Sequence, residues 1–460
     1  MSSAVQMNQP IDGLPLREEA AKGSLPKVAY IMSRFPKLTE TFVLYEILQL
    51  EELGFTVEIY PLLREHPRVL HPEAERLVQR AHYGPFLSLA VLRAQWRFLR
   101  RRPSLYWQTL WAVLRGTFGS ANFFFGALAI FPKAVWFAEQ VERQGVAHVH
   151  AHFANHPTVA AFIVHRLTGI PFSFTAHGSD LHVERRMLKQ KVEAAAFVVT
   201  VSDYNSKLIV SECGQQARNK VRVIHCGVDS RVFPAPVRLG RRGRPRILCV
   251  ASFEEVKGHT YLIESCRLLR ERGVEFECHL VGEGPFRGDV EAQVAEAGLG
   301  SQVHLHGGRP RPEVARMMAG ADILVLPSVP TRKGKREGIP VVLMEGMASG
   351  LPVVASALSG IPELVESDRT GLLVPPRDSV RLADALQRLL RDPKLRLQMG
   401  RRGQRKVLRD FNLQTNVAAL SKLFLAVSAH TDRPGKCAQL GRVSVATHHC
   451  DSTPCLKEVR

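Results

Sequence analysis

The sequence predicts an α/β protein made of two Rossmann-like, doubly wound domains that face each other across a cleft. Three observations indicate this fold class: a length of 460 residues, two successive series of short apolar segments separated by helical patterns, and a basic, proline-containing segment between the series. This length corresponds to two or three domains. Strands that alternate with helices are typical of parallel sheets covered by helices on both faces.

The first domain is expected over residues 27–232. Residues 1–26 are polar and mixed in charge, which predicts a flexible N-terminus and no secretory signal. The strand candidates of the first domain are short runs rich in Val, Ile and Ala. They are residues 28–32, 56–60, 148–150, 172–175, 197–201 and 221–224.

Residues from about 64 to 145 fit neither strand series and predict a helical insertion in the first domain. Six arginines and no acidic residue lie between positions 93 and 115, interleaved with aromatic residues. The same region holds all four tryptophans of the chain: Trp96, Trp107, Trp111 and Trp136. One interpretation is a basic amphipathic surface in a membrane interface. The other is a helical insertion whose aromatic side chains face the core and whose arginines are solvated.

The second domain is expected over residues 247–429. It follows residues 233–246, which contain three prolines, five arginines and no acidic residue and therefore predict a linker. Its strand candidates are residues 247–251, 277–281, 303–306, 323–326, 352–355 and 371–374. Residues 430–460 lose all periodicity and predict a disordered tail. The cleft between the domains is the first place to expect a site.

The composition argues against a membrane-spanning, zinc-binding or disulfide-rich protein. Hydrophobic residues make up 45% and charged residues 23%, as in soluble globular proteins. The longest apolar run, residues 123–131, is too short to cross a bilayer. Eight cysteines without a CxxC pair indicate neither a zinc site nor a disulfide framework, so we expect a reducing, cytoplasmic location. The net charge of +19 predicts affinity for phosphates, nucleic acid or acidic lipid.

The segment 336–354 carries the most specific pattern. Pro340 suits the first turn of a helix, and Gly350 and Pro352 end it before a strand. The free amides at such a helix start, together with the helix dipole, can hold a diphosphate. Glu337 lies just before this helix and Glu345 inside it, a spacing that suits two separate hydroxyl contacts on a sugar nucleotide.

The two glutamates match the E-x7-E signature, and the segment resembles the retaining family 4 glycosyltransferases, which have the GT-B fold. Residues 281–285, 307–328 and 359–374 resemble further parts of the donor-binding domain of that family, in the same order. Residues 33–43 resemble the branch that contains colanic-acid-type exopolysaccharide glycosyltransferases. The resemblance is dense from about residue 247 to residue 390.

The resemblance implies roles for the residues around this helix. Glu345 would bind the ribose hydroxyls of the donor. Glu337, with the adjoining amides of Gly338 and Ile339, would hold the donor sugar. Lys257 would lie on the diphosphate and stabilise the charge of the leaving group.

Other donor-side residues follow from the same resemblance. Gly282 and Gly284 would let the backbone approach the substrate closely, and Arg309 belongs to a block expected near the base. Ser252 departs from the family, which commonly carries an arginine at this place. Four nearby cations could supply the positive charge of the missing arginine: Arg332, Lys333, Lys335 and Arg336.

The first domain carries fewer motifs that resemble those of the family. Thr39 and Glu40 follow its first strand and are expected on the acceptor side of the cleft. In similar enzymes a histidine at the place of His177 contacts the transferred sugar, and Asp180 would brace its loop. Histidines are also clustered at positions 148, 150 and 152, but their spacing fits a strand edge better than a metal site, and we expect no metal.

The resemblance implies a retaining hexosyltransferase that needs no cofactor and uses a nucleoside-diphosphate sugar. The acceptor would be a polysaccharide or a lipid-linked saccharide, and the enzyme could work at the inner face of the cytoplasmic membrane. Two alternatives stay open: a catalytically weak or inactive GT-B protein that binds carbohydrate or nucleotide, and a sugar-nucleotide epimerase. A nucleic-acid-binding protein would explain the charge but not the ordered motifs, so no nucleic acid is expected.

Overall fold

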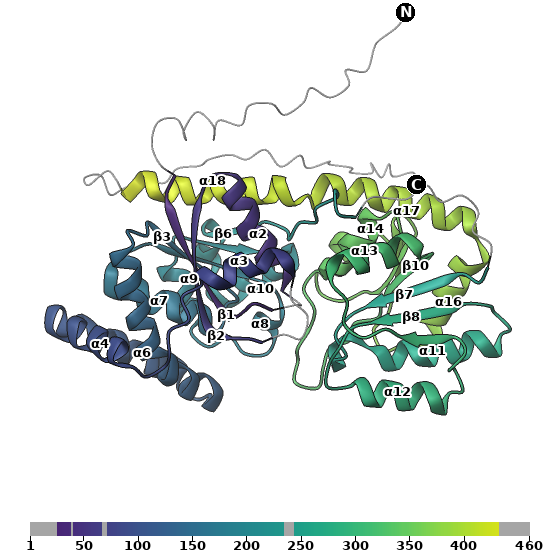
Figure 1. Cartoon of the computed structure of the whole chain (residues 1–460), viewed down its shortest axis with the longest axis horizontal. Coiled ribbons are helices and arrows are strands. Elements are labelled where there is room, and N and C mark those ends of the chain that lie inside the picture. Colours follow the sequence, from purple (N-terminus) through teal and green to yellow (C-terminus); the bar gives the residue numbers. More distant parts are fainter. Residues whose placement is uncertain (1–24, 38–39, 67–70, 234–242, 432–460) are drawn as a thin grey trace, which may run out of the picture.

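The computed structural model describes residues 25–37, 40–66, 71–233 and 243–431. They form two domains that lie side by side (Figure 1), each with a six-stranded parallel sheet covered by helices. This confirms the predicted fold class. The predicted tails fall almost entirely outside the described residues, as do the middle of the predicted linker and Thr39.

The twelve expected strands all form and differ from the predictions mainly at their ends. The first sheet has the order β2-β1-β3-β4-β5-β6, and the second has the order β12-β11-β10-β7-β8-β9. The strands of the first sheet are β1 (Lys27–Phe35), β2 (Thr56–Arg64), β3 (His148–His152), β4 (Phe172–Ala176), β5 (Phe197–Thr200) and β6 (Val221–Val223). Those of the second are β7 (Arg246–Val250), β8 (Glu277–Val281), β9 (Val303–Leu305), β10 (Ile323–Leu326), β11 (Val353–Ser356) and β12 (Gly371–Val374).

Helices connect the strands and cover both faces of the sheets. Those between β1 and β6 are α2 (Thr41–Glu52), α3 (Pro72–Arg80), α4 (Leu89–Arg101), α5 (Pro103–Thr117), α6 (Ala121–Arg143), α7 (His156–Thr168), α8 (Ser179–His182), α9 (Leu188–Ala194), α10 (Asp203–Cys213) and η1 (Gln215–Asn219). Those after β7 are η2 (Glu255–Lys257), α11 (His259–Glu271), α12 (Arg287–Glu296), α13 (Arg311–Gly320), α14 (Val341–Ala348), α15 (Ile361–Leu364), α16 (Ser379–Arg391), α17 (Pro393–Asp410) and α18 (Leu413–Thr431).

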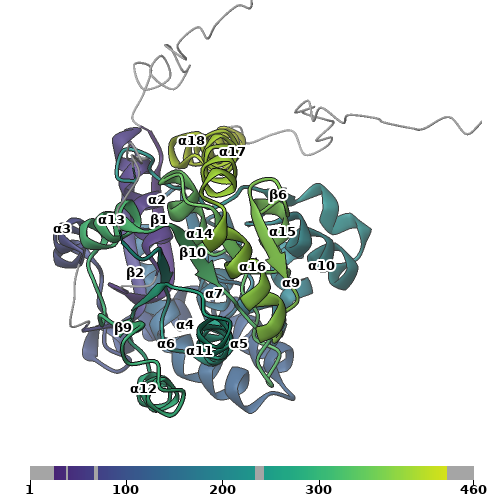
Figure 2. The same cartoon turned by 90° about the vertical axis from the view of Figure 1, so that its right-hand side faces the viewer.

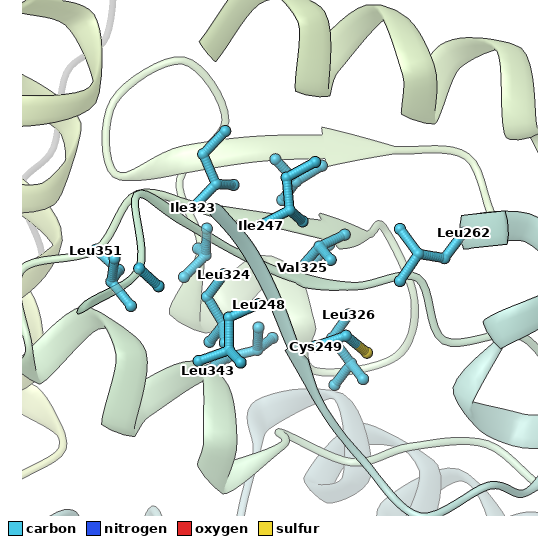
Figure 3. Close-up of a cluster of buried hydrophobic side chains, with 14 of the residues drawn as sticks. Ile247, Leu248, Cys249, Leu262, Ile323, Leu324, Val325, Leu326, Leu343 and Leu351 are labelled. Atoms are coloured by element: carbon cyan, nitrogen blue, oxygen red, sulfur yellow. The ribbon is translucent and has the colours of Figure 1, made fainter. Parts of the chain in front are cut away.

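The core of the second domain is built from the central strands and the helices against them. Ile247, Leu248 and Cys249 of β7 pack beside residues 323–326 of β10, with Leu343 of α14 beneath (Figure 3). All of these side chains are buried. Strands that are covered on both faces need such continuous apolar runs. These runs are the pattern from which the strands could be predicted.

The first domain has a separate core on each face of its sheet. Along β1, Ala29 and Ile31 belong to one core, whereas Val28, Tyr30 and Met32 belong to the other. This is the alternation expected for successive residues of a strand. One core is covered by α6 and α7, and the other by α2 and α18.

The last helix corrects the predicted domain boundary. The second domain was expected to run to residue 429, but Leu413, Val417, Leu420 and Phe424 of α18 are buried in a core of the first domain. Figures 1 and 2 show α17 and α18 following one another along the same side of the molecule. The chain crosses back near Asn412, where Val228 pairs with it in an isolated bridge. The sequence pattern does not show which sheet this helix covers.

Within the described residues, α6 is the one helix that is long and apolar enough to cross a membrane by length and composition. Half of its most apolar window is buried inside the structure. It packs against α7, α4 and α5, so it serves as a core helix of the first domain. Pro132 lies inside it.

Candidate active site

A cleft of about 390 Å³ lies between the two domains and is lined by residues of both. It opens where the strand order of each sheet reverses, beside β1 and β3 in the first domain and beside β7 in the second. Ligands of open α/β sheets bind at such points, and the volume is typical of small-molecule sites. The cleft brings together nine predicted site residues: Glu40, His177, Lys257, Gly282, Arg309, Glu337, Gly338, Ile339 and Glu345.

Helix α14 directs its first turn into the cleft. Leu343, Met344 and Met347 are buried in the core of the second domain and hold the helix in place. Pro340 at the N-cap and the two residues after it line the cleft. No side chain among the described residues caps this helix, so the amides of its first turn are available to an anion.

Two contacts join the domains beside the cleft. A Cβ atom on Gly338 would lie 2.0 Å from the carbonyl oxygen of His177, so any side chain there would push the domains apart. Glu363 of the second domain accepts hydrogen bonds from the amides of Asp203 and Tyr204, both at 2.8 Å. These amides begin α10, where a carboxylate is favoured by the helix dipole.

Lys257 and Glu337 form an ion pair on the wall of the cleft. The Lys257 Nζ lies 2.8 Å from the Glu337 Oε1, and both side chains are mostly buried. Lys257 ends η2 and precedes Gly258, whose φ of +71° and contact with the Pro327 carbonyl exclude a side chain. This tight turn directs the lysine toward the cleft.

Glu345 is buried at the inner end of the cleft. Burial raises the pKa of Glu345 to about 7, although the charge of Arg311 lowers it. The Arg311 Nε lies 3.9 Å from the Glu345 Oε1, and its guanidinium carbon lies 3.8 Å from the ring centre of Tyr45 in the first domain. The buried Nε of Arg311 has no hydrogen-bond partner among the described residues.

The two predicted glycines differ in their relation to the cleft. Gly282 lines it, whereas Gly284 does not. A Cβ on Gly282 would lie 1.9 Å from the Ala251 carbonyl oxygen, and one on Gly284 would lie 2.5 Å from the Phe253 carbonyl oxygen. Gly284 therefore packs against the neighbouring loop, and its predicted role beside the substrate stays a prediction.

On the first-domain side, Glu40 lines the cleft and pairs with Lys37 at 2.5 Å. Asp180 is not among the residues that line the cleft. Its buried carboxylate accepts hydrogen bonds from the amides of Ala154, His177 and Gly178. Asp180 thus holds the loop that carries His177.

The comparisons with known proteins identify the family. The chain matches "Glycosyl transferases group 1" over residues 237–406 and "Glycosyltransferase Family 4" over residues 106–232. It is 32% identical to the colanic acid biosynthesis glycosyltransferase WcaL of Escherichia coli, over 87% of this chain and 100% of that protein. The chain belongs to glycosyltransferase family 4. It is also 30% identical to the amylovoran biosynthesis glycosyltransferase AmsK of Erwinia amylovora, over 79% of this chain and 90% of that protein.

Solved structures share the GT-B fold of this family 4 glycosyltransferase. A glycosyltransferase from Rickettsia africae covers 87% of this chain and 98% of its own, with a TM-score of 0.64 and 17% identity. HepE from Anabaena, solved in complex with UDP, covers 87% of this chain and 100% of its own, with a TM-score of 0.65 and 16% identity.

Behind His177, the glycosyltransferase contains a chain of hydrogen bonds that the sequence did not reveal. The His177 Nε2 lies 3.0 Å from the His152 Nδ1, and the His152 Nε2 lies 3.1 Å from the Glu46 Oε1. The same oxygen accepts the hydroxyl of Tyr30 at 2.7 Å. Burial lowers the pKa of His177, so its ring is neutral. Glu46 interrupts an apolar stretch of α2, and this was its only signal in the sequence.

Three atoms of this region could also hold a metal ion, because ligand atoms of Glu46, His150 and His152 lie within 4.8 Å of one another. The two nitrogens of His150, however, already contact the hydroxyls of Ser173 and Thr175. Burial lowers the pKa of His150 as well. Both ring nitrogens of His150 are therefore already engaged by hydroxyl groups, and the expected lack of a metal stays a prediction.

Replacing Glu46 by alanine is expected to lower the rate of sugar transfer about tenfold, since it removes the group that orients His152 and, through it, His177. Glu46→Gln should largely restore the rate, because both hydrogen bonds go to one oxygen, which glutamine retains. Nitrogen NMR of the histidine rings should show a changed tautomer of His177 in the alanine variant only. An unchanged tautomer in Glu46→Ala would contradict this positioning role.

Ser252 lines the cleft. Its hydroxyl donates to Glu254 at 3.1 Å, and Glu254 also accepts from the Lys335 Nζ at 2.6 Å. Lys335 and Arg336 line the cleft, whereas Arg332 and Lys333 do not. Of the four cations considered, Lys335 is therefore the one held next to Ser252.

Proposed function

We propose that this enzyme transfers a hexose from a nucleoside-diphosphate sugar, with retention of its anomeric configuration, to a saccharide acceptor of an exported polysaccharide. The observation that carries the proposal is the wall of the cleft. There Lys257, the first turn of α14 and Glu345 lie together on the second domain and face His177. The names of WcaL and AmsK, which refer to colanic acid and amylovoran biosynthesis, support a polysaccharide product.

The chemistry follows from the groups on this wall. Lys257 and the amides of α14 stabilise the negative charge that develops on the diphosphate as its bond to the sugar breaks. Glu337, paired with Lys257, positions the sugar. The acceptor hydroxyl attacks from the face that the diphosphate leaves, and its proton passes to the departing phosphate oxygen. Closure of the domains excludes water, which would otherwise hydrolyse the donor.

A panel of nucleoside-diphosphate sugars tests the proposal. We expect one donor to raise the melting temperature by mass action and to be consumed only when a saccharide acceptor is present. UDP-glucose is a reasonable first donor, since HepE was solved in complex with it. Product anomers read by NMR should keep the configuration of the donor. Conversion of the donor to an epimer without an acceptor, or no stabilisation by any donor, would contradict the proposal.

Glu345 makes donor binding depend on pH. Its ionised carboxylate accepts hydrogen bonds better than its protonated form, so affinity for a sugar nucleotide should rise as the pH passes through about 7. The Glu345→Gln variant should bind about 10- to 100-fold more weakly above that pH and lose the dependence. Calorimetry at several pH values measures both effects, and an equal dependence in both proteins would contradict the role of Glu345.

The raised pKa of Glu345 also affects the stability of the folded protein, and this effect has the opposite dependence on pH. Glu345 favours the folded state below its ordinary pKa of 4.5, and this contribution is lost as the pH rises through its folded-state value of about 7. Bound donor should therefore offset a stability cost that the empty protein bears at neutral and alkaline pH.

A further inference from the structure

The helical insertion exposes an unusual number of large apolar side chains. Trp96, Trp107 and Trp111 are 64%, 59% and 66% exposed, so the alternative in which they face the core is wrong for these three. We call the following exposed residues the insertion face: Leu87, Leu89, Leu92, Trp96, Trp107, Trp111, Phe118, Phe125 and Leu128. So many exposed large apolar side chains within one segment of the chain indicate a binding surface.

These residues are not needed to hold the insertion together. Helix α4 already buries Val91, Ala94 and Phe98, and α5 buries Tyr106 and Val113. The helices pack on one another, and α5 and α6 pack on α7. Figure 1 shows α4 and α6 at the end of the first domain that lies away from the second domain. The insertion therefore has a packed interior and, in addition to it, a set of exposed apolar side chains.

The charge on this surface has one sign. No aspartate or glutamate occurs between Glu75 and Glu139. Arg97 is paired with Glu139 and Glu142. Five other arginines are exposed and have no ion pair within the described part of the chain: Arg93, Arg100, Arg101, Arg102 and Arg115.

On this basis we propose that the insertion face docks the protein on a bilayer that contains anionic lipids. Tryptophan rings prefer the headgroup level of a membrane, where one side is apolar and the other is wet. Arginines beside them pair with lipid phosphates. A surface that combines both, without any acidic residue, is complementary to such a membrane. Because half of the most apolar window of α6 is buried in the domain, this helix stays in the domain and the described residues lie on the surface of the bilayer.

Flotation of the full chain with vesicles tests this inference without any substrate. We expect binding to vesicles of phosphatidylcholine and phosphatidylglycerol, a blue shift of tryptophan emission, and little binding to phosphatidylcholine alone. Arg100→Gln with Arg101→Gln should lower the partition coefficient about 25-fold, at roughly fivefold for each charge. Trp107→Ser with Trp111→Ser should lower it more than about tenfold and reduce the blue shift.

A matched control uses the second domain, where Val380 is exposed at the start of α16 and Arg381 and Arg391 are exposed on the same helix. Val380→Ser and Arg381→Gln with Arg391→Gln should leave vesicle binding unchanged. Equal melting temperatures and equal stabilisation by the donor would show that the insertion variants are folded. Failure of the unaltered chain to float with anionic vesicles would overturn the inference, as would equal loss in the control variants or equal binding to neutral vesicles.

Discussion

Replacing Lys257 by methionine is expected to lower kcat/KM for sugar transfer by about 10²- to 10³-fold, the usual cost of removing one group that stabilises transition-state charge. Methionine retains much of the length of the side chain but has no charge. Lys257 lies on the cleft wall beside the first turn of α14, so its charge acts where the diphosphate would gain negative charge. Release of nucleoside diphosphate, measured with saturating acceptor, gives the rate.

A surface lysine provides the control. Lys422 is exposed on α18, away from the residues that line the cleft, and Lys422→Met should transfer at the unaltered rate. If Lys257→Met changed only the KM for the donor and left kcat intact, the lysine would contribute uniform binding and not stabilisation of the transition state.

Replacing Glu337 by glutamine is expected to lower kcat by about 10²-fold while donor affinity changes little. In the proposed function the carboxylate positions the sugar, and it pairs with Lys257 at 2.8 Å. Its loss both loosens the sugar and leaves the lysine free to move. Because a misplaced reacting group costs rate more than it costs binding, kcat should carry most of the loss.

The ion pair makes these two effects non-additive. The Lys257→Met, Glu337→Gln double variant should be far less impaired than the product of the single effects predicts, since residues in direct contact couple. Calorimetry with the nucleoside diphosphate completes the test. Fully multiplicative losses, or a large loss of nucleotide affinity in Glu337→Gln, would contradict the assigned roles.

Much of the fold was predictable because buried parallel strands impose a simple pattern. Residues 323–326 form an uninterrupted apolar run, and β10 is buried on both faces. The site on α14 was predictable for a related reason: Pro340, the apolar residues after it and the two glutamates lie within one short stretch, so local sequence determines their relative positions.

The rest depended on contacts between distant segments. The bond between Glu46 and His152 joins residues 106 positions apart, and nothing near either residue in the sequence points to the other. Arg311 meets Tyr45 only because the two domains face each other. The orientation of the tryptophans was likewise open, since an amphipathic pattern does not say which face of a helix a neighbour covers.

The place of α18 has a consequence for how this enzyme is made. One face of the first sheet is completed by Leu420 and Phe424, which are among the last residues that the structure describes. While the ribosome is still adding the second domain, the nascent first domain must therefore carry an uncovered apolar surface. Its maturation has to wait until α18 has been translated, and a fragment that stops before Asn412 should need a chaperone or aggregate.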